Sequence, residues 1–554
     1  MQLPGTPPAR TAETAPQDFD ALIVGAGFAG MYMLHRLRRL GLRVRVLEAG
    51  EGVGGTWYWN RYPGARCDVE SVQYSYQFSP ELEQEWTWSE RYATQPEILR
   101  YANHVADRFD LRRDIQFDTR VLSAVHDDAG AHWTLRTSTG EVFRAPYCIM
   151  ATGCLSATNR PRIPGLESFA GALYHTGEWP HAGVDFDGKR VGVIGTGSSA
   201  IQSIPVIAQQ AEHVTVFQRT PHYTVPAHNA PLDPGYVREI KANYRTLRAR
   251  AKQMFSGIDF RLNPDSALAV DPQARLREYE ARWAHGGTTF MGAFSDLLFD
   301  RDANETAAAF VREKIREIVR DPAVAEALSP HDIIGCKRLC VDTDYYATFN
   351  RPNVTLVDVS STPIEAIEPG GVRVDGRLHE LDALVLATGF DAMTGALNRI
   401  DIRGRGGRAL RDKWREGPKS YLGLMIEGFP NLFTITGPGS PSVLTNMLPS
   451  IEQHVDWIAD CIAYLRDRGT ARIEPTRDAE EAWVEHVRVV AGPNLRAVCS
   501  SWYVGANVPG KPRVFMPYIG GFPEYVRKCE EVVEAGYAGF VLGPPVSQIG
   551  SPSV

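Results

Sequence analysis

Apolar and polar residues alternate along the chain in a pattern that predicts strands and helices in turn. Residues 19–49 give an apolar run, a glycine-rich turn, a stretch with one apolar face and a second apolar run. This order predicts a strand–helix–strand unit, because short apolar runs suit buried strands and a 3.6-residue period suits a helix. Residues 188–219 repeat the order. The sequence therefore predicts an α/β fold that contains two such units.

The first glycine turn has the composition of a dinucleotide site. Gly25, Gly27 and Gly30 form G-x-G-x-x-G directly after the predicted strand. Such glycines permit a tight turn, let the backbone approach a pyrophosphate and allow helix and strand to pack closely. Glu48 ends the next predicted strand, where a carboxylate accepts hydrogen bonds from ribose hydroxyls. FAD and NAD both fit this unit.

The second glycine turn differs in the residues that follow it. Gly195 and Gly197 precede Ala200, and alanine is an accepted third residue of the motif. The next predicted strand ends in Arg219 and Thr220 instead of an acid. A guanidinium suits the 2′-phosphate of NADPH. We therefore expect two Rossmann-like dinucleotide-binding domains, of which the second binds NADPH.

The remaining pattern divides the chain further. Apolar strands that end in ATG, at 147–153 and 383–390, indicate crossings between the two nucleotide domains, and residues 221–333 are charged and helix-favouring. We expect a flexible lead (1–18), an FAD-binding domain (19–154 and 391–542, the second part with a substrate loop), an NADP-binding domain (155–220 and 334–390), a helical insert (221–333) and a tail (543–554).

Composition excludes several classes of protein. The chain has 554 residues, enough for three or four domains at about 150 residues each. Its 59 basic and 66 acidic residues leave a net charge of −7, which offers no basic field for nucleic acid. No apolar stretch approaches the ~20 residues that span a bilayer. We expect a cytoplasmic protein without membrane contact that is a monomer or a weak oligomer.

The eight cysteines are scattered and form no CxxC pair. This spacing favours reduced thiols over a disulfide framework, and it provides no metal-ligand cluster. Cys336 and Cys340 are spaced CxxxC, but no neighbouring Cys or His supports a metal or redox role. We interpret both as packing residues and expect no metal.

Two further motifs carry a specific resemblance. Residues 54–64 read GGTWYWNRYPG, and residues 169–180 read F-x-G-x-x-x-H-T-x-x-W-P, just before the second glycine turn. Both match signatures of Baeyer–Villiger monooxygenases, and residues 19–542 resemble the branch with phenylacetone and steroid monooxygenases. The second signature is carried by Phe169, Gly171, His175, Thr176, Trp179 and Pro180.

The resemblance implies an activity. In this family NADPH reduces FAD, oxygen adds to the reduced flavin, and the peroxyflavin attacks a ketone to give an ester or lactone. A fixed cation in a dry site would stabilise such an anion. Arg338 matches the family's active-site arginine, and Asp68 matches the carboxylate that contacts it and tunes its charge.

The resemblance also implies the remaining site residues. Lys337 matches a residue that assists Arg219 at the 2′-phosphate. His175 and Trp179 are expected to hold positions between domains, and direct proton transfer by His175 is a minor alternative. Further cofactor contacts are expected at Gly55, Trp57, Asp68, Ser198 and Trp502. A pocket for a hydrophobic ketone, whether aryl, cyclic or steroidal, is expected at Ser440, Pro441, Ser442, Leu444 and Met447.

Three alternatives remain open at the level of the sequence. A related flavin monooxygenase that oxidises sulfides or amines would share both nucleotide folds. A flavoprotein reductase would need a dithiol, and the absence of CxxC argues against it. A redox sensor that binds FAD and NADPH without catalysis would not need Arg338 and Asp68. The complete H-T-x-x-W-P ending and this pair favour ketone oxidation.

Overall fold

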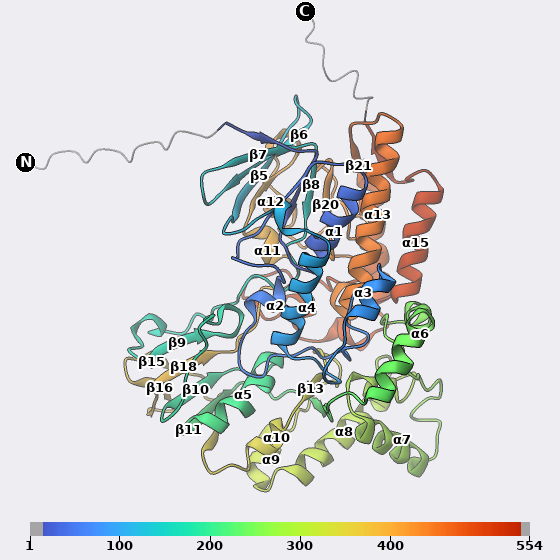
Figure 1. Cartoon of the computed structure of the whole chain (residues 1–554). Helices are drawn as coiled ribbons and strands as arrows, with labels where there is room; N and C mark the ends of the chain where they lie inside the picture. Colours follow the sequence, from blue (N-terminus) through green and yellow to red (C-terminus); the bar gives the residue numbers. More distant parts are fainter. Residues whose placement is uncertain (1–14, 544–554) are drawn as a thin grey trace, which may run out of the picture.

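A parallel sheet forms the first part of the fold in the computed structural model, which describes residues 15–543 (Figure 1). The helix α1 (Phe28–Arg39) connects its neighbouring strands β2 and β3, so the first predicted strand–helix–strand unit is confirmed. All neighbours in the sheet are parallel, in the order β20 (Leu432–Thr434), β8 (Tyr147–Met150), β2 (Ala21–Val24), β3 (Val44–Leu47) and β4 (Ile115–Gln116).

A second parallel sheet contains the second unit. The helix α5 (Ser198–Gln210) connects β10 to β11, again as predicted. The edge strand β9 comes from the stretch that carries the H-T-x-x-W-P signature. The strand order is β14 (Val354–Asp358), β11 (His213–Gln218), β10 (Arg190–Ile194), β18 (Ala383–Leu386) and β9 (Ala172–His175).

A third sheet lies above the first in Figure 1. Its first strand includes Gln17 and Asp18, which pair with Phe143 and Arg144. The described end of the expected flexible lead is therefore part of a sheet, whereas residues 1–14 and 544–554 lie outside the described residues. Its order is β1 (Gln17–Asp18), β7 (Val142–Ala145), β6 (His132–Thr137), β5 (Val121–Asp127) and β19 (Asp401–Arg403).

Four helices fill most of the region that we expect to be a helical insert. In Figure 1 the first two lie at the lower right, and the other two run along the bottom of the molecule toward the second sheet. An aspartate caps the first, second and fourth helix, and a proline follows each of these aspartates. This arrangement favours the start of a helix, because the carboxylate accepts hydrogen bonds from backbone N–H groups that have no partner within the helix. The helices are α6 (Pro234–Gln253), α7 (Pro272–His285), α8 (Arg301–Ile318) and α9 (Pro322–Leu328).

Further strands and helices complete the fold. The strand β12 (Thr224–Pro226) pairs with β13 (Cys340–Asp342) and so brings the two ends of the helical region together. A hairpin sheet contains β15 (Ala366–Glu368), β16 (Gly371–Val374) and β17 (Arg377–Glu380). The other elements are α2 (Thr56–Trp59), α3 (Pro80–Glu85), α4 (Gln95–Arg108), α10 (Tyr345–Thr348), α11 (Gly395–Asn398), α12 (Leu410–Lys413), α13 (Met447–Asp467), β21 (Ile473–Pro475), α14 (Arg477–Ala491), α15 (Phe522–Glu534) and β22 (Phe540–Leu542).

The largest apolar core joins segments that are distant in the sequence. It packs α13 against α1, and its side chains include Met33 of α1 and Ile458 of α13, both fully buried. The return of the chain after residue 391 therefore completes the packing around the first sheet. Within residues 15–543, none of the helices combines the length and the apolar character that crossing a bilayer requires.

Candidate active site

The first glycine turn lies at the end of β2 and is closed to side chains. Gly25 has φ +105°, and a Cβ atom there would lie 2.6 Å from the carbonyl oxygen of Ala151. A Cβ atom on Gly30 would lie 1.8 Å from the carbonyl oxygen of Gly25, so α1 packs directly on the turn. Gly55 lies close to Gly27: a Cβ atom on Gly55 would be 2.8 Å from the Cα atom of Gly27. This bare backbone suits a pyrophosphate at the N-terminus of α1.

Glu48 braces the same turn from the end of β3. Its carboxylate accepts hydrogen bonds from the backbone N–H groups of Ala26, at 2.6 Å, and Gly50, at 2.8 Å. Burial raises the pKa of Glu48, while these two donors oppose the shift. Each carboxylate oxygen keeps a further lone pair for a ribose hydroxyl. Nearby, Trp57 is buried and its indole N–H donates to the hydroxyl of Tyr74 at 3.1 Å.

The second glycine turn has the same backbone but different surroundings. Gly195 has φ +116°, and its added Cβ atom would lie 2.5 Å from the carbonyl oxygen of Ala387. The space next to Gly197 is open, and Ser198 begins α5 directly after it. Arg219 and Thr220 are exposed at the end of β11. The guanidinium of Arg219 makes no hydrogen bond or ion pair within residues 15–543, so it is available to an anionic ligand.

Lys337 and Arg338 are neighbours with different partners. The Nζ atom of Lys337 lies 3.5 Å from a carboxylate oxygen of Asp332. Burial and, to a smaller extent, the charge of Lys337 lower the pKa of His222 to about 3. The assistance that we expect from Lys337 at the 2′-phosphate stays a prediction.

The predicted pair of Arg338 and Asp68 is in contact. The Nε atom of Arg338 donates to Oδ2 of Asp68 at 3.2 Å, and its Nη1 atom donates to the carbonyl oxygen of Val443 at 3.3 Å. Burial is the largest single effect and acts to lower the pKa of Arg338, but the charge and hydrogen bond of Asp68, together with Tyr503 and Cys67, outweigh it and raise the pKa of the guanidinium. Burial raises the pKa of Asp68, and Arg338 opposes that shift. The site therefore holds a fixed cation against a buried carboxylate.

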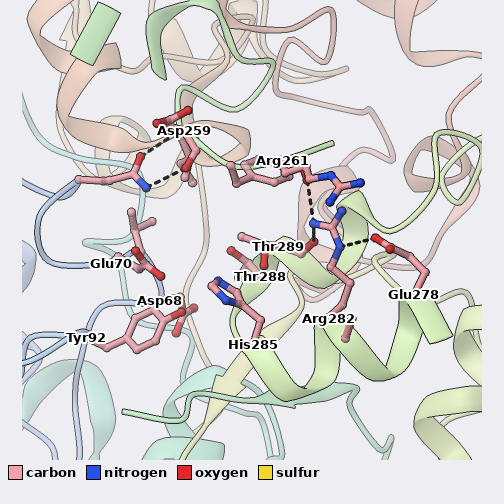
Figure 2. A pocket seen from close by; sticks show the side chains of 15 residues that line it. Asp68, Glu70, Tyr92, Asp259, Arg261, Glu278, Arg282, His285, Thr288 and Thr289 are labelled. Atoms are coloured by element: carbon pink, nitrogen blue, oxygen red, sulfur yellow. Dashed lines mark hydrogen bonds and ion pairs between the residues drawn. The ribbon is translucent and has the colours of Figure 1, made fainter. Parts of the chain in front are cut away.

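A cavity of about 380 Å³ adjoins this pair. Figure 2 shows Asp68 and Tyr92 on one side of the cavity and the α7 residues Glu278 and Arg282 on the other. The lining is rich in charged and polar side chains, including His285. A ketone site is expected to have a mostly apolar lining, so this cavity does not match it. The apolar surface lies instead on the Val443 side of Arg338.

That apolar surface unites the predicted substrate loop with Trp502. Leu444, Met447 and Trp502 are half-buried and pack in one cluster with the buried Val443 and Tyr503. The predicted contacts Ser440, Pro441 and Ser442 are buried, and both serine hydroxyls have protein partners, namely the carbonyl oxygen of Gly437 and the sulfur of Met393. The loop therefore presents Leu444 and Met447 and turns its serines inward.

Comparisons with known proteins identify the family. A family model described as pyridine nucleotide-disulphide oxidoreductase matches residues 22–260. A curated protein named Baeyer-Villiger monooxygenase, from Pseudooceanicola batsensis, is 45% identical over 96% of this chain and 97% of its own length. The chain belongs to the Baeyer–Villiger monooxygenases.

Solved structures of similar proteins agree with this family. A structure titled as an oxidised steroid monooxygenase bound to NADP is 56% identical, with a TM-score of 0.91, over 95% of this chain and all of its own. A structure titled as OTEMO in complex with FAD and NADP is 39% identical, with a TM-score of 0.92, over 96% of this chain and all of its own. The expected resemblance and the α/β fold class are confirmed.

The signature of the Baeyer–Villiger monooxygenases at 169–180 lies at the edge of the second sheet. His175 is buried, its Nδ1 atom accepts from the backbone N–H of Gly177 at 3.0 Å, and its Nε2 atom lies 3.3 Å from the hydroxyl of Thr388. Burial lowers the pKa of His175. The hydroxyl of Thr176 lies 3.1 Å from that of Ser199 on α5. These contacts support the expected positional role of His175, which stays a prediction.

The other residues of the signature make packing contacts. Trp179 is buried with its ring centroid 5.4 Å from that of Tyr174. A Cβ atom on Gly171 would lie 2.5 Å from the carbonyl oxygen of Asp382, so glycine permits this edge to approach β18. Phe169 is partly buried against the apolar cluster that contains Leu384 and Leu386 of β18, and Pro180 follows Trp179 at the end of the signature.

One prediction about the cysteines is wrong. Cys336 forms a disulfide with Cys499, which lies 163 residues later, with Cα atoms 5.7 Å apart. Cys336 is therefore not a simple packing residue, although Cys340 is buried with a free thiol as expected. Spacing along the chain could not reveal the pair, because folding brings the segment before Trp502 against the segment before Arg338. The Nε atom of Arg496 also donates to the carbonyl oxygen of Gly335 at 2.9 Å and joins the same two segments.

The sequence missed several residues that contact the site. Val443 offers only its carbonyl oxygen to Arg338, and no side-chain pattern reveals such a contact. Tyr503 is buried beside Trp502, with ring centroids 4.2 Å apart. Gln202 donates to Asp68 from α5. Its position on the helix after the second glycine turn was the available signal, since that turn faces a ligand.

Proposed function

We propose that this chain binds FAD at the first glycine turn and NADPH at the second, and that it uses molecular oxygen to convert hydrophobic ketones into esters or lactones. The observation that carries the proposal is the contact of Arg338 with both Asp68 and the carbonyl oxygen of Val443. This contact places a fixed cation between a buried carboxylate and the apolar cluster of Leu444, Met447 and Trp502.

Both cofactors fit the residues that are present. The backbone at Gly25, Gly30 and Gly55 leaves no room for a side chain, which suits the close approach of a pyrophosphate, and Glu48 offers oxygen lone pairs beside it. The open space at Gly197 offers the second site, and the free guanidinium of Arg219 suits a 2′-phosphate. Reduced FAD supplies the activated oxygen for the reaction when it is bound.

Arg338 has the main catalytic role in this proposal. Its charge is fixed by contacts on two sides, so it is oriented before negative charge develops in the site. A preorganised cation in a site with little water stabilises an oxyanion far more than bulk solvent does. Asp68 restrains the guanidinium and moderates its charge.

The domain division supports this arrangement. We infer an FAD-binding part formed by residues 19–154 and 391–542 and an NADP-binding part formed by residues 155–220 and 334–390. Asp68 then comes from the first part and Arg338 from the second, so the catalytic pair forms where the two parts meet. The insert at 221–333 contributes the α7 wall of the cavity beside Asp68.

The substrate class follows from the apolar cluster. Leu444 and Met447 are half-buried aliphatic side chains, and Trp502 offers a flat indole face. These surfaces suit a ketone with aryl or alicyclic bulk. The 56% identity to a protein titled steroid monooxygenase supports the inclusion of polycyclic ketones.

The test is product analysis by the FAD-loaded protein with NADPH and oxygen. Phenylacetone, cyclohexanone and progesterone represent the aryl, cyclic and steroidal classes. We expect ester or lactone in proportion to the NADPH consumed with at least one of them. NADPH consumption that gave sulfoxide from an aryl sulfide but no ester from any ketone would favour heteroatom oxidation instead. FAD binding without oxidation of NADPH would favour a sensor.

A further inference from the structure

Gln202 connects the second nucleotide-binding unit to the catalytic carboxylate. It lies on α5, in the turn of helix after the second glycine motif, and its side chain is buried. Its Nε2 atom donates to Oδ1 of Asp68 at 3.3 Å and to the carbonyl oxygen of Arg66 at 3.1 Å. Its Oε1 atom accepts from the hydroxyl of Tyr62 at 2.8 Å. The amide therefore has partners on both of its polar atoms.

These partners fix which way the amide points. The Oε1 atom is held by a hydroxyl that can donate and also accepts from the backbone N–H of Arg66 at 3.4 Å. Because a backbone N–H can only donate and a backbone carbonyl can only accept, Oε1 must face the N–H of Arg66, and the NH₂ group must face the carbonyl oxygen of Arg66 and the carboxylate of Asp68. Gln202 thus acts as a donor to the carboxylate.

Asp68 has one side-chain donor on each oxygen. Arg338 donates to Oδ2 and Gln202 donates to Oδ1, and within residues 15–543 no other hydrogen bond to this carboxylate is present. A carboxylate held at only one oxygen can rotate about its last side-chain bond. Two donors on opposite oxygens fix the plane of the carboxylate and, through it, the direction of the Arg338 guanidinium.

The backbone confirms that α5 is docked at this point. Gly64, in the RYPG part of the signature at 54–64, has φ +79°, and a Cβ atom there would lie 2.2 Å from the carbonyl oxygen of Gln202. The RYPG segment therefore approaches α5 at Gln202 through both the Tyr62 hydroxyl and the Gly64 backbone. This contact gives the second half of that signature a structural reason.

We propose that Gln202 is a positioning residue that orients Asp68 toward Arg338 and so makes the catalytic pair depend on the docking of α5 against the RYPG segment. The inference rests on the proposed roles of Arg338 and Asp68. Because α5 follows the NADP-binding turn, a displacement of that unit would be transmitted to the carboxylate through one amide.

The main test compares Gln202→Met in two backgrounds. Methionine matches the length of the side chain and removes both polar atoms. In the otherwise unchanged protein we expect ester formation per enzyme to fall about tenfold, the peroxide share of the NADPH consumed to rise, and the KM for NADPH to stay within about twofold. In an Asp68→Ala background, the same change should lower ester formation by less than about twofold, because the group through which Gln202 acts is absent.

Control variants separate positioning from packing. Gln209→Ala changes an exposed glutamine on the same helix and should leave every rate unchanged. Tyr62→Phe removes the hydroxyl that orients the amide but keeps the NH₂ group of Gln202 that donates to Asp68. We therefore expect ester formation to fall by less than in Gln202→Met. A rise in the KM for NADPH with unchanged ester formation would instead make Gln202 a cofactor-binding residue and overturn the inference.

A second readout is independent of ester formation. The unfolding midpoints of the same four proteins, FAD-loaded, form a stability cycle for Gln202 and Asp68. We expect the two changes to be non-additive, since the residues share a buried hydrogen bond. Additive effects would overturn the inference even if ester forms, and non-additive effects with no ester from any ketone would overturn only the proposed function.

Discussion

The guanidinium of Arg338 donates to the carbonyl oxygen of Val443 at 3.3 Å and so connects this cation to the loop that contributes Val443 and Leu444 to the apolar cluster. Because the acceptor is a backbone carbonyl, this hydrogen bond does not depend on which side chains the loop carries. The direction of Arg338 therefore depends on the backbone path of the loop more than on the identity of its side chains.

Arg338→Ala should reduce ester formation by about 10²- to 10³-fold, the usual loss when a preorganised charge-stabilising donor is removed. FAD content and the rate of flavin reduction by NADPH should change little, because Arg338 lies beside Asp68 and Val443 and not at either glycine turn. Rapid-mixing absorbance of the flavin and product analysis measure the two effects. Ester formation at the original rate would show that another group stabilises the developing charge.

Arg219→Ala should raise the KM for NADPH at least tenfold and leave the KM for NADH nearly unchanged. The guanidinium is exposed at the end of β11 and has no partner among residues 15–543, so we expect its loss to remove mainly the attraction to the 2′-phosphate. Steady-state kinetics with both nucleotides provide the measurement, and Arg277→Ala, an exposed arginine on α7, is the matched control. Equal changes for both nucleotides would contradict the assignment.

Thiol titration should distinguish the disulfide from free cysteines. The sequence has eight cysteines, of which Cys336 and Cys499 form the disulfide and six are free. Protein that is denatured without reductant should therefore show six thiols, and reduced protein should show all eight. Eight thiols before reduction would mean that the protein as purified lacks the bond.

Stability should depend on pH through Glu452. Burial raises the pKa of this carboxyl on α13 to about 7, while its oxygen accepts from the backbone N–H groups of Gln77 at 2.6 Å and Phe78 at 3.0 Å. The unfolded chain ionises near the ordinary value of 4.5, so between pH 4.5 and 7 the folded state binds more protons than the unfolded state. Stability that is present at low pH is then lost as pH rises through this window.

Glu452→Gln should remove that dependence. The unfolding midpoint of the variant should equal or fall below that of the original protein at pH 5 and should exceed it at pH 8. Relative to the original protein, the free energy of unfolding of the variant should rise between pH 5 and pH 8 by a few kcal/mol at most. Each unit of difference between the folded and unfolded pKa of Glu452 is worth about 1.4 kcal/mol. A constant difference between the proteins from pH 5 to pH 8 would show that Glu452 does not titrate in this range.

Much of the fold could be predicted because its signals are local. The strand–helix–strand units around Gly25 and Gly195 are specified by short apolar runs, a helical period and glycines that only a tight turn requires. Such patterns depend on residues within about 30 positions of one another. The resemblance to family signatures then pointed to Asp68 and Arg338, which the fold brings into contact.

The sequence by itself thus determined the two strand–helix–strand units and, through the family resemblance, pointed to Asp68 and Arg338 as the proposed catalytic pair. Only the tertiary structure decided the partners of that pair and the Cys336–Cys499 disulfide. The residues concerned are far apart in the chain, with 134 positions between Asp68 and Gln202 and 163 between the two cysteines. Their contacts follow from how separately formed sheets and helices pack together, and periodicity within one element carries no information about that packing.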